Sequence, residues 1–205
     1  MGFDMQNQAI PPDSGLIELA RSDPDEAWGL SLVPSWFRRQ EDGPAPGREG
    51  KPRNNPIWDE CCRLVGVHPD FRTRNCFLDR DWDVLHYLLS ATRRNEPATA
   101  NDLVIDRAFR AGELIADHVQ GGQEVPVRYL SPAAVSEIAA VLEPLDREAL
   151  ARHYDPARMD DEVYKFSAED ADEVGWERIV GYFTAFRSFF LAAAGAGDAV
   201  IVCKD

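Results

Sequence analysis

The chain has 205 residues, of which 44% are hydrophobic and 28% are charged. This length and balance predict one soluble globular domain that buries enough apolar surface to fold without disulfide bonds. Aspartate and glutamate number 36 against 22 lysines and arginines, which gives a formal net charge of −14. Such a charge repels nucleic acid and anionic membranes, so we expect neither as a partner.

Several features of the sequence predict a cytoplasmic location. Residues 1–10 have neither the basic region nor the apolar region of a signal peptide. The longest mostly apolar stretch, residues 183–194, is interrupted by Arg187 and predicts a buried helix, not a membrane span. Adjacent cysteines form a strained disulfide, so we expect reduced, buried thiols at Cys61, Cys62, Cys76 and Cys203.

The first 78 residues predict short elements separated by a long loop. Weak alternation over residues 1–5 predicts an edge strand, and Asp13-Ser14 and Asp23-Pro24 predict the starts of two helices. Residues 40–56 hold seven glycines and prolines among 17 residues and lack large apolar side chains, which predicts a loop or insertion. An amphipathic helix is expected over residues 57–67.

The segment from Asp79 to Thr92 organises the rest of the prediction. Its large side chains recur at helical spacing on one face, at Trp82, Leu85, His86 and Leu89. Asp79, Asp81 and Asp83 crowd its start, where carboxylates favour the positive end of the helix dipole. We therefore expect a helix that turns an indole and an imidazole inward.

The remaining segments predict a helix-rich α+β domain with a small sheet of short, mostly antiparallel strands. Helices are expected after Asn101 with Leu103 inward, and after the capping residues Ser131, Asp146, Asp155 and Asp172. Strands are expected at residues 114–119, 125–130, 163–166 and 199–203, with Pro126 favouring an edge position for the second.

Three blocks of this sequence resemble the YfbM-like family, a bacterial group known as domain of unknown function 1877. The blocks are the Asp-Trp-Asp-Val-Leu-His-Tyr-Leu-Leu-Ser run at residues 81–90, the Val-Arg-Tyr-Leu-Ser-Pro run at residues 127–132, and residues 150–159 with Tyr-Asp-Pro. The resemblance covers residues 79–205, whereas residues 28–78 look longer than usual for the family. It implies a compact cytosolic α+β fold and brings no established activity.

A pocket around His86 is the candidate site that these blocks suggest. We expect it to be lined by Trp82, His86, Tyr129 and Tyr154, with Arg128 at its mouth. An imidazole acts as acid, base or ligand near neutral pH, so His86 is the best single candidate for a functional residue. The alternative is a buried histidine that is hydrogen-bonded to a backbone carbonyl or a carboxylate.

Neither a metal nor a cofactor is expected. Cys61, Cys62, His68 and Cys76 have poor spacing for zinc, because adjacent cysteines do not readily face one ion. A calcium loop starting at Asp170 fails, since Val174 and Gly181 occupy ligand positions. Nucleotide-binding glycine motifs and the Gly-x-Ser-x-Gly nucleophile motif are absent from the sequence.

The most acidic segment runs from residue 155 to residue 177, with nine acids against Arg158 and Lys165. It is either a solvated face or a docking surface for a basic protein, such as a toxin-type or nucleic-acid-binding protein. We therefore expect a non-enzymatic binding or protein-interaction module with an acidic surface. The alternative is a small-molecule-binding or hydrolytic protein that uses the His86 pocket.

Overall fold

The computed structural model describes residues 4–22, 29–38, 56–110, 112–115 and 127–204. Its centre is a five-stranded sheet in the order β2-β1-β5-β4-β3, in which every pairing is antiparallel. The strands are β1 (Met5–Ile10), β2 (Asn75–Asp79), β3 (Glu113–Leu114), β4 (Arg128–Leu130) and β5 (Ala199–Lys204). β1 and β5 pair along their whole length, from Met5 opposite Lys204 to Ile10 opposite Ala199.

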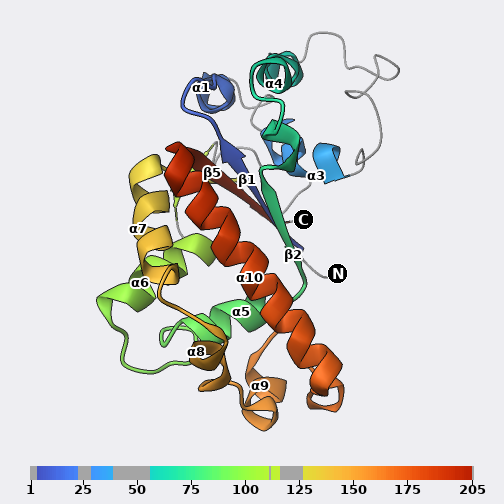
Figure 1. The fold of residues 1–205 in the computed structure, drawn as a ribbon, viewed down its shortest axis with the longest axis vertical. Coiled ribbons are helices and arrows are strands. Elements are labelled where there is room, and N and C mark those ends of the chain that lie inside the picture. Colours follow the sequence, from blue (N-terminus) through green and yellow to red (C-terminus); the bar gives the residue numbers. More distant parts are fainter. Residues whose placement is uncertain (1–3, 23–28, 39–55, 111, 116–126, 205) are drawn as a thin grey trace.

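Helices cover both faces of this sheet (Figure 1). One face carries α1 (Leu16–Ser22), α3 (Val33–Arg38) and α4 (Pro56–Val67). The other side carries α5 (Trp82–Leu89), α6 (Ala100–Phe109), α7 (Pro132–Leu142) and α10 (Glu173–Ala196), with α8 (Arg147–Ala151) and α9 (Pro156–Glu162) at one end. Two short 3-10 turns, Phe71–Thr73 and Ala168–Asp170, complete the described elements.

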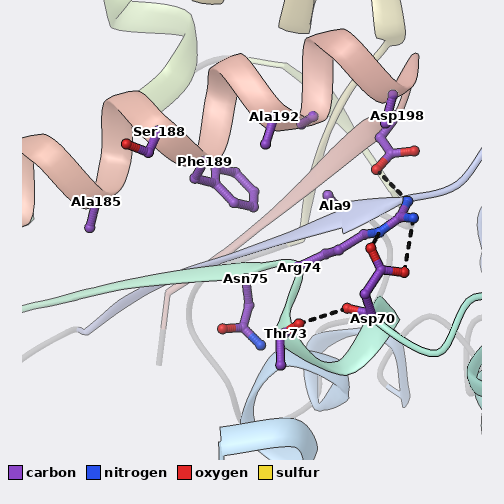
Figure 2. Close-up of a pocket in the computed structure, with 12 residues that line it drawn as sticks. Ala9, Asp70, Thr73, Arg74, Asn75, Ala185, Ser188, Phe189, Ala192 and Asp198 are labelled. Carbon is purple, nitrogen blue, oxygen red and sulfur yellow. Dashed lines mark hydrogen bonds and ion pairs between the residues drawn. The ribbon is translucent and has the colours of Figure 1, made fainter.

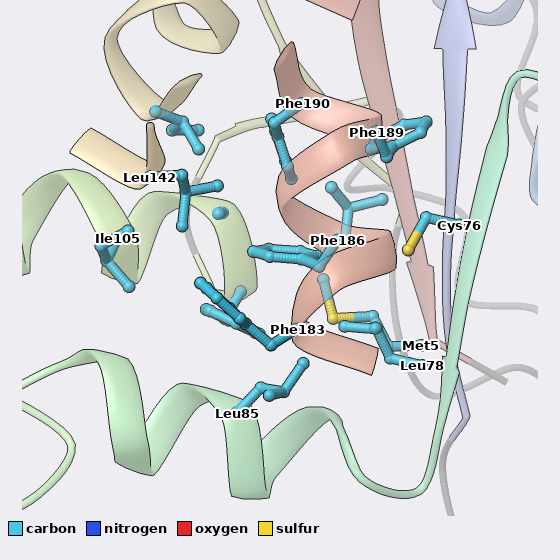
Figure 3. Packing of buried hydrophobic residues seen from close by; sticks show 14 of the residues in the cluster. Met5, Cys76, Leu78, Leu85, Ile105, Leu142, Phe183, Phe186, Phe189 and Phe190 are labelled. Carbon is cyan, nitrogen blue, oxygen red and sulfur yellow. The ribbon is translucent and has the colours of Figure 1, made fainter. Parts of the chain in front are cut away.

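Each face of the sheet has its own hydrophobic core. Alternate residues of β5 enter opposite cores: Val200 and Val202 join the larger cluster, while Ile201 and Cys203 join the smaller one. In the larger cluster, Phe183, Phe186 and Phe190 project from α10 toward α6 and α7 (Figure 3). Because both faces are covered, β5 reads in the sequence as an uninterrupted apolar run.

Four of the helices begin at the predicted capping residues. The Ser131 hydroxyl accepts a hydrogen bond from the amide of Ala134, with Pro132 in the first turn of α7. Asp146, Asp155 and Asp172 cap α8, α9 and α10 in the same way. Together with the antiparallel sheet, these helices confirm the predicted α+β class with short antiparallel strands.

α10 is long and apolar enough to cross a membrane by length and composition alone. The central helix of a globular core has the same two properties. Here α10 packs chiefly on α7 and β2 and supplies Phe183, Phe186 and Phe190 to the larger core cluster. This agrees with the prediction of a buried helix over residues 183–194.

The first strand is not where the sequence predicts it, and it is not an edge strand. β1 spans Met5–Ile10 and lies between β2 and β5, while residues 1–3 fall outside the described part of the chain. Its polar side chains Gln6, Asn7 and Gln8 are buried, and Gln8 Nε2 donates a hydrogen bond to the Phe71 carbonyl at 2.9 Å. Asn7 Nδ2 likewise donates to the Cys76 carbonyl, whereas the amide oxygens of Asn7 and Gln8 accept no hydrogen bond from the described part of the chain. Contacts this distant in sequence cannot be recognised from local polarity.

The segment from Asp79 to Thr92 begins with the last residue of a strand, and its helix starts only three residues later. Asp79 is the last residue of β2, with a φ of 43°, and α5 begins at Trp82 without a side-chain cap from Asp81. Asp83 lies in the first turn of α5, where the sequence predicts a carboxylate, and it is buried. The predicted inward orientation holds for Leu85 and His86, whereas Trp82 and Leu89 are only partly buried.

Other boundaries also differ from the prediction. Thr99, not Asn101, caps α6 through a capping box with Asp102, and Leu103 is 58% exposed. The predicted strand at residues 163–166 is a turn. β4 is paired on both sides, so it is not an edge strand, and β2 was not predicted. The predicted loop at residues 40–56 lies outside the described residues except for Pro56, which begins α4, and so does most of the predicted strand at 114–119.

Candidate functional site

His86 lies inside the larger core, where it is 1% exposed. Its Nε2 atom is 2.6 Å from Asp106 Oδ1, and its ring stacks on Phe109 with centroids 4.7 Å apart. Burial lowers the pKa of His86 to about 4, although the hydrogen bond with Asp106 opposes the shift. The imidazole is therefore neutral at pH 7 and donates its Nε2 hydrogen to the carboxylate. This matches the structural alternative that the sequence left open.

The five residues of the predicted pocket do not converge on one cavity. Tyr129 belongs to the smaller core on the opposite face of the sheet, with the Arg21 guanidinium 5.5 Å from its ring. Tyr154 packs on Trp176, with ring centroids 4.6 Å apart. Neither of the two cavities described in this structure is lined by His86.

Trp82 and Arg128 have a different neighbour, Lys204, at the end of β5. The Lys204 ammonium lies 3.5 Å from the centre of the Trp82 ring. Arg128 pairs with Val202 across β4 and β5, which places its side chain on the same sheet face as Lys204. These residues sit beside the larger core and not inside a pocket with Tyr129.

The predicted thiol chemistry is partly corrected. None of the four cysteines forms a disulfide, and Cys61, Cys76 and Cys203 are buried, but Cys62 is exposed. Burial raises the pKa of Cys76 to about 12, so this thiol stays protonated at neutral pH. Within the described ranges, no three His, Cys, Asp or Glu side chains are grouped as metal ligands.

Several carboxylates of the acidic segment at residues 155–177 stabilise the fold through helix caps, hydrogen bonds and ion pairs. Asp155 and Asp172 cap helices, Asp160 accepts a hydrogen bond from the amide of Ala168, and Glu177 pairs with Arg147. These contacts account for several carboxylates without a partner protein. The segment is therefore a weaker candidate docking surface than its charge suggests.

A cleft of about 470 Å³ lies between the C-terminal half of α10 and the start of β2 (Figure 2). One wall is formed by small residues of α10 and the ring of Phe189. The other wall is polar and comes from the 3-10 turn and β2. The lining residues that matter for the chemistry are Asp70, Arg74, Asn75, Ser188, Ala192 and Asp198.

Arg74 connects two carboxylates at one end of this cleft. Its Nε and Nη2 atoms donate to the two oxygens of Asp70 at 2.9 and 3.0 Å, and its Nη1 atom donates to Asp198 Oδ2 at 2.9 Å. Asp198 is 1% exposed, and its Oδ1 atom accepts no hydrogen bond from the described part of the chain. Burial raises the pKa of the Asp198 carboxyl, and the charge of Arg74 opposes that shift.

This end of the cleft carries one positive and two negative charges, so its net charge is −1. A buried carboxylate oxygen without a donor is costly, because desolvation removes its water without replacement. The arrangement therefore favours a ligand that brings a cation or an N–H donor. The sequence did not predict this site, because Arg74 and Asp198 lie 124 residues apart in the chain.

The sequence of the chain was also compared with known families. The model of a family described as a domain of unknown function, DUF1877, matches residues 60–203. The chain belongs to the DUF1877 family. The predicted YfbM-like resemblance is thus confirmed, and the family match begins before residue 79, where the recognised blocks were expected to start.

Among solved structures, this DUF1877 chain is similar to a protein of unknown function, YfbM from Escherichia coli, with 16% identity and a TM-score of 0.48. The similarity covers 72% of this chain and 94% of that chain. No curated protein matches the chain. Because the family has no assigned activity, function has to be inferred from the geometry of the site.

Proposed function

We propose that this DUF1877 protein is a non-enzymatic binding module that takes a cationic side chain of a basic protein partner into the α10–β2 cleft. The observation that carries the proposal is the Oδ1 atom of Asp198, a buried carboxylate oxygen without a protein donor at the edge of that cleft. A lysine or arginine of the partner would supply the missing donor.

The charge balance supports a cation as the occupant. Arg74 already serves both Asp70 and Asp198 and cannot neutralise both carboxylates. The pKa of Asp198 is raised by burial, which means that the fold pays a cost for its negative charge. A second cation at Oδ1 would lower that pKa again and stabilise the charged form.

The wall of the cleft formed by α10 suits the aliphatic part of the partner's lysine or arginine side chain. Ala185, Ala192 and Ala196 are spaced along α10, and Phe189 lies between them (Figure 2). Lysine and arginine stems pack on such apolar surfaces while their charged heads reach polar groups. The net charge of −14 would also accelerate encounter with a basic partner.

The geometry favours this proposal over the alternative of a hydrolytic or small-molecule site at His86. A general base has to reach a substrate, and His86 is buried against Asp106 and Phe109 with a pKa of about 4. The proposal keeps the expectations of a cytoplasmic protein with four reduced cysteines that binds neither nucleic acid nor membranes.

Calorimetric titration with short peptides of matched length tests the proposal. An arginine-containing and a lysine-containing peptide should bind, and glutamine-containing and glutamate-containing peptides should not. Filling the cleft by Ala192→Leu should weaken binding about tenfold, whereas Ala133→Leu, at an exposed position of α7, should leave it unchanged. Equal affinity in both variants would contradict binding in the cleft.

A further inference from the structure

A second charged cluster lies at the other end of β5 and has the opposite sign. It consists of Lys204, the last residue of β5, together with Arg110 at the end of α6 and Arg128 on β4. Arg128 and Lys204 are diagonal neighbours on one sheet face, because Arg128 pairs with Val202. Three cations therefore approach each other in a protein whose overall charge is strongly negative.

Lys204 is held in a defined position. Its ammonium lies 3.5 Å from the centre of the Trp82 ring, which is a close cation–π contact. In the described part of the chain, neither Lys204 nor Arg128 forms an ion pair with a carboxylate. Trp82, the first residue of α5, thus holds the Lys204 ammonium in place without neutralising its charge.

Among the described residues, Asp83 is the carboxylate whose charge acts on Lys204, and it is already engaged. Asp83 accepts two hydrogen bonds from Arg93, at 2.9 and 2.7 Å, and a third from the amide of Tyr164 at 2.9 Å. Arg110 also forms an ion pair with Asp83, at the longer distance of 3.8 Å. Asp83 therefore shares one negative charge between Arg93 and Arg110, and no carboxylate of the described residues pairs with Lys204 or Arg128.

We propose that Lys204, Arg110 and Arg128 form a binding site for a small oxyanion beside Trp82. An anion placed among the three side chains would accept charge-assisted hydrogen bonds from Lys204 and from the guanidinium groups. The recognised chemistry is a carboxylate or a tetrahedral phosphate-type group. This site is independent of the α10–β2 cleft, which takes a cation at the opposite end of β5.

The ionisation of Lys204 fits this site. Burial lowers the pKa of Lys204 to about 8, and the charges of Arg110 and Arg128 act in the same direction while Asp83 opposes them. The groups that face Lys204 are these three and Trp82, with Met5 opposite it on β1. A bound anion would reverse the repulsion and raise the pKa of Lys204.

Thermal unfolding in sulfate and in acetate, against chloride at constant ionic strength, tests the proposal. Neither probe changes charge between pH 6 and pH 9, so any pH dependence reports on the protein. We expect specific stabilisation at pH 7 that weakens as the pH rises through about 8. A larger effect of sulfate than of acetate would assign the site to tetrahedral anions, and the reverse to carboxylates.

The decisive comparison uses the two lysines that the structure describes. Lys204→Met should lower the affinity for the anion at least about tenfold, because a charge-assisted hydrogen bond is lost. Lys165→Met makes the same change at an exposed lysine that also lies near an aromatic ring, Tyr164, and should have no effect. If Lys204→Met does not fold, Arg128→Met should show the same loss. Sulfate and acetate effects equal to chloride, or unchanged affinity in these variants, would overturn the proposal.

Discussion

Asp83 and Arg93 form a two-point ion pair in which each carboxylate oxygen accepts one guanidinium hydrogen bond, at 2.9 and 2.7 Å. Asp83 is almost fully buried and also accepts a hydrogen bond from the amide of Tyr164. The pair therefore connects the start of α5 with the turn that follows α9. Its hydrogen bonds to Arg93 and Tyr164 outweigh the effect of burial and lower the pKa of Asp83.

Removing Arg93 should destabilise the fold strongly. Arg93→Met leaves a buried carboxylate without its cation, and we expect a loss of about 3–5 kcal/mol in the free energy of unfolding. Arg107→Met, which breaks a largely exposed pair with Glu137, should cost at most about 1 kcal/mol. Urea unfolding of both variants measures the difference, and similar losses would show that the Asp83 pair is not a structural centre.

The free energy of unfolding should decrease as the pH is lowered, because His86 is buried in its neutral form. Its pKa is about 4 in the fold and about 6.5 in the unfolded chain. As the pH is lowered, the imidazole of the unfolded chain is therefore protonated at a higher pH than that of the folded chain, which favours unfolding. The contribution of neutral His86 is complete above pH 6.5 and is lost as the pH falls toward 4, by about 3 kcal/mol at most.

Unfolding measured from pH 7 to pH 4.5 in the wild type and in His86→Gln checks this assignment. The glutamine amide retains a donor for Asp106 but does not titrate, so the variant should have a shallower slope. His68→Gln, a change outside both core clusters, should retain most of the wild-type slope. A His86→Gln slope equal to that of the wild type would contradict the buried, neutral assignment.

Two glycines of the last helix region should respond in opposite directions. Gly181 lies on the exposed side of α10 with open space around it, so Gly181→Ala should stabilise the protein by about 1 kcal/mol. Gly197 ends the helix with a φ of 70°, and an alanine there should cost about 1–2 kcal/mol. Thermal unfolding of the two variants gives the signs, and equal signs would contradict this account of the helix end.

Local patterns in the sequence predicted much of the fold. The capping residues Ser131, Asp146, Asp155 and Asp172 act as expected because a helix cap is satisfied within four residues. The same holds for the buried helix predicted over residues 183–194, which is part of α10. These elements depend on neighbours in the chain, which periodicity detects directly.

The errors arise where distant residues decide the outcome. β1 is central although it contains Gln6, Asn7 and Gln8, because its backbone pairs on both sides and the amides of Asn7 and Gln8 donate to distant backbone carbonyls. The predicted pocket failed for a similar reason: Tyr129 alternates with Arg128 along β4 and so faces the other core. The cleft was missed because Arg74 and Asp198 meet only in the folded chain.

The most direct test of the proposed function compares the affinity of one arginine-containing peptide for two variants with the same change of charge. Asp198→Asn removes the buried acceptor, and Asp161→Asn removes an exposed carboxylate on α9 that makes no ion pair in the described structure. If the cleft binds the cation, Asp198→Asn should bind at least about tenfold more weakly while Asp161→Asn binds as the wild type does. Circular dichroism confirms that both variants are folded, and Ala192→Leu replaces Asp198→Asn if it is not. Equal affinities would contradict the proposal, since the cation would then be attracted by the overall charge and not by Asp198.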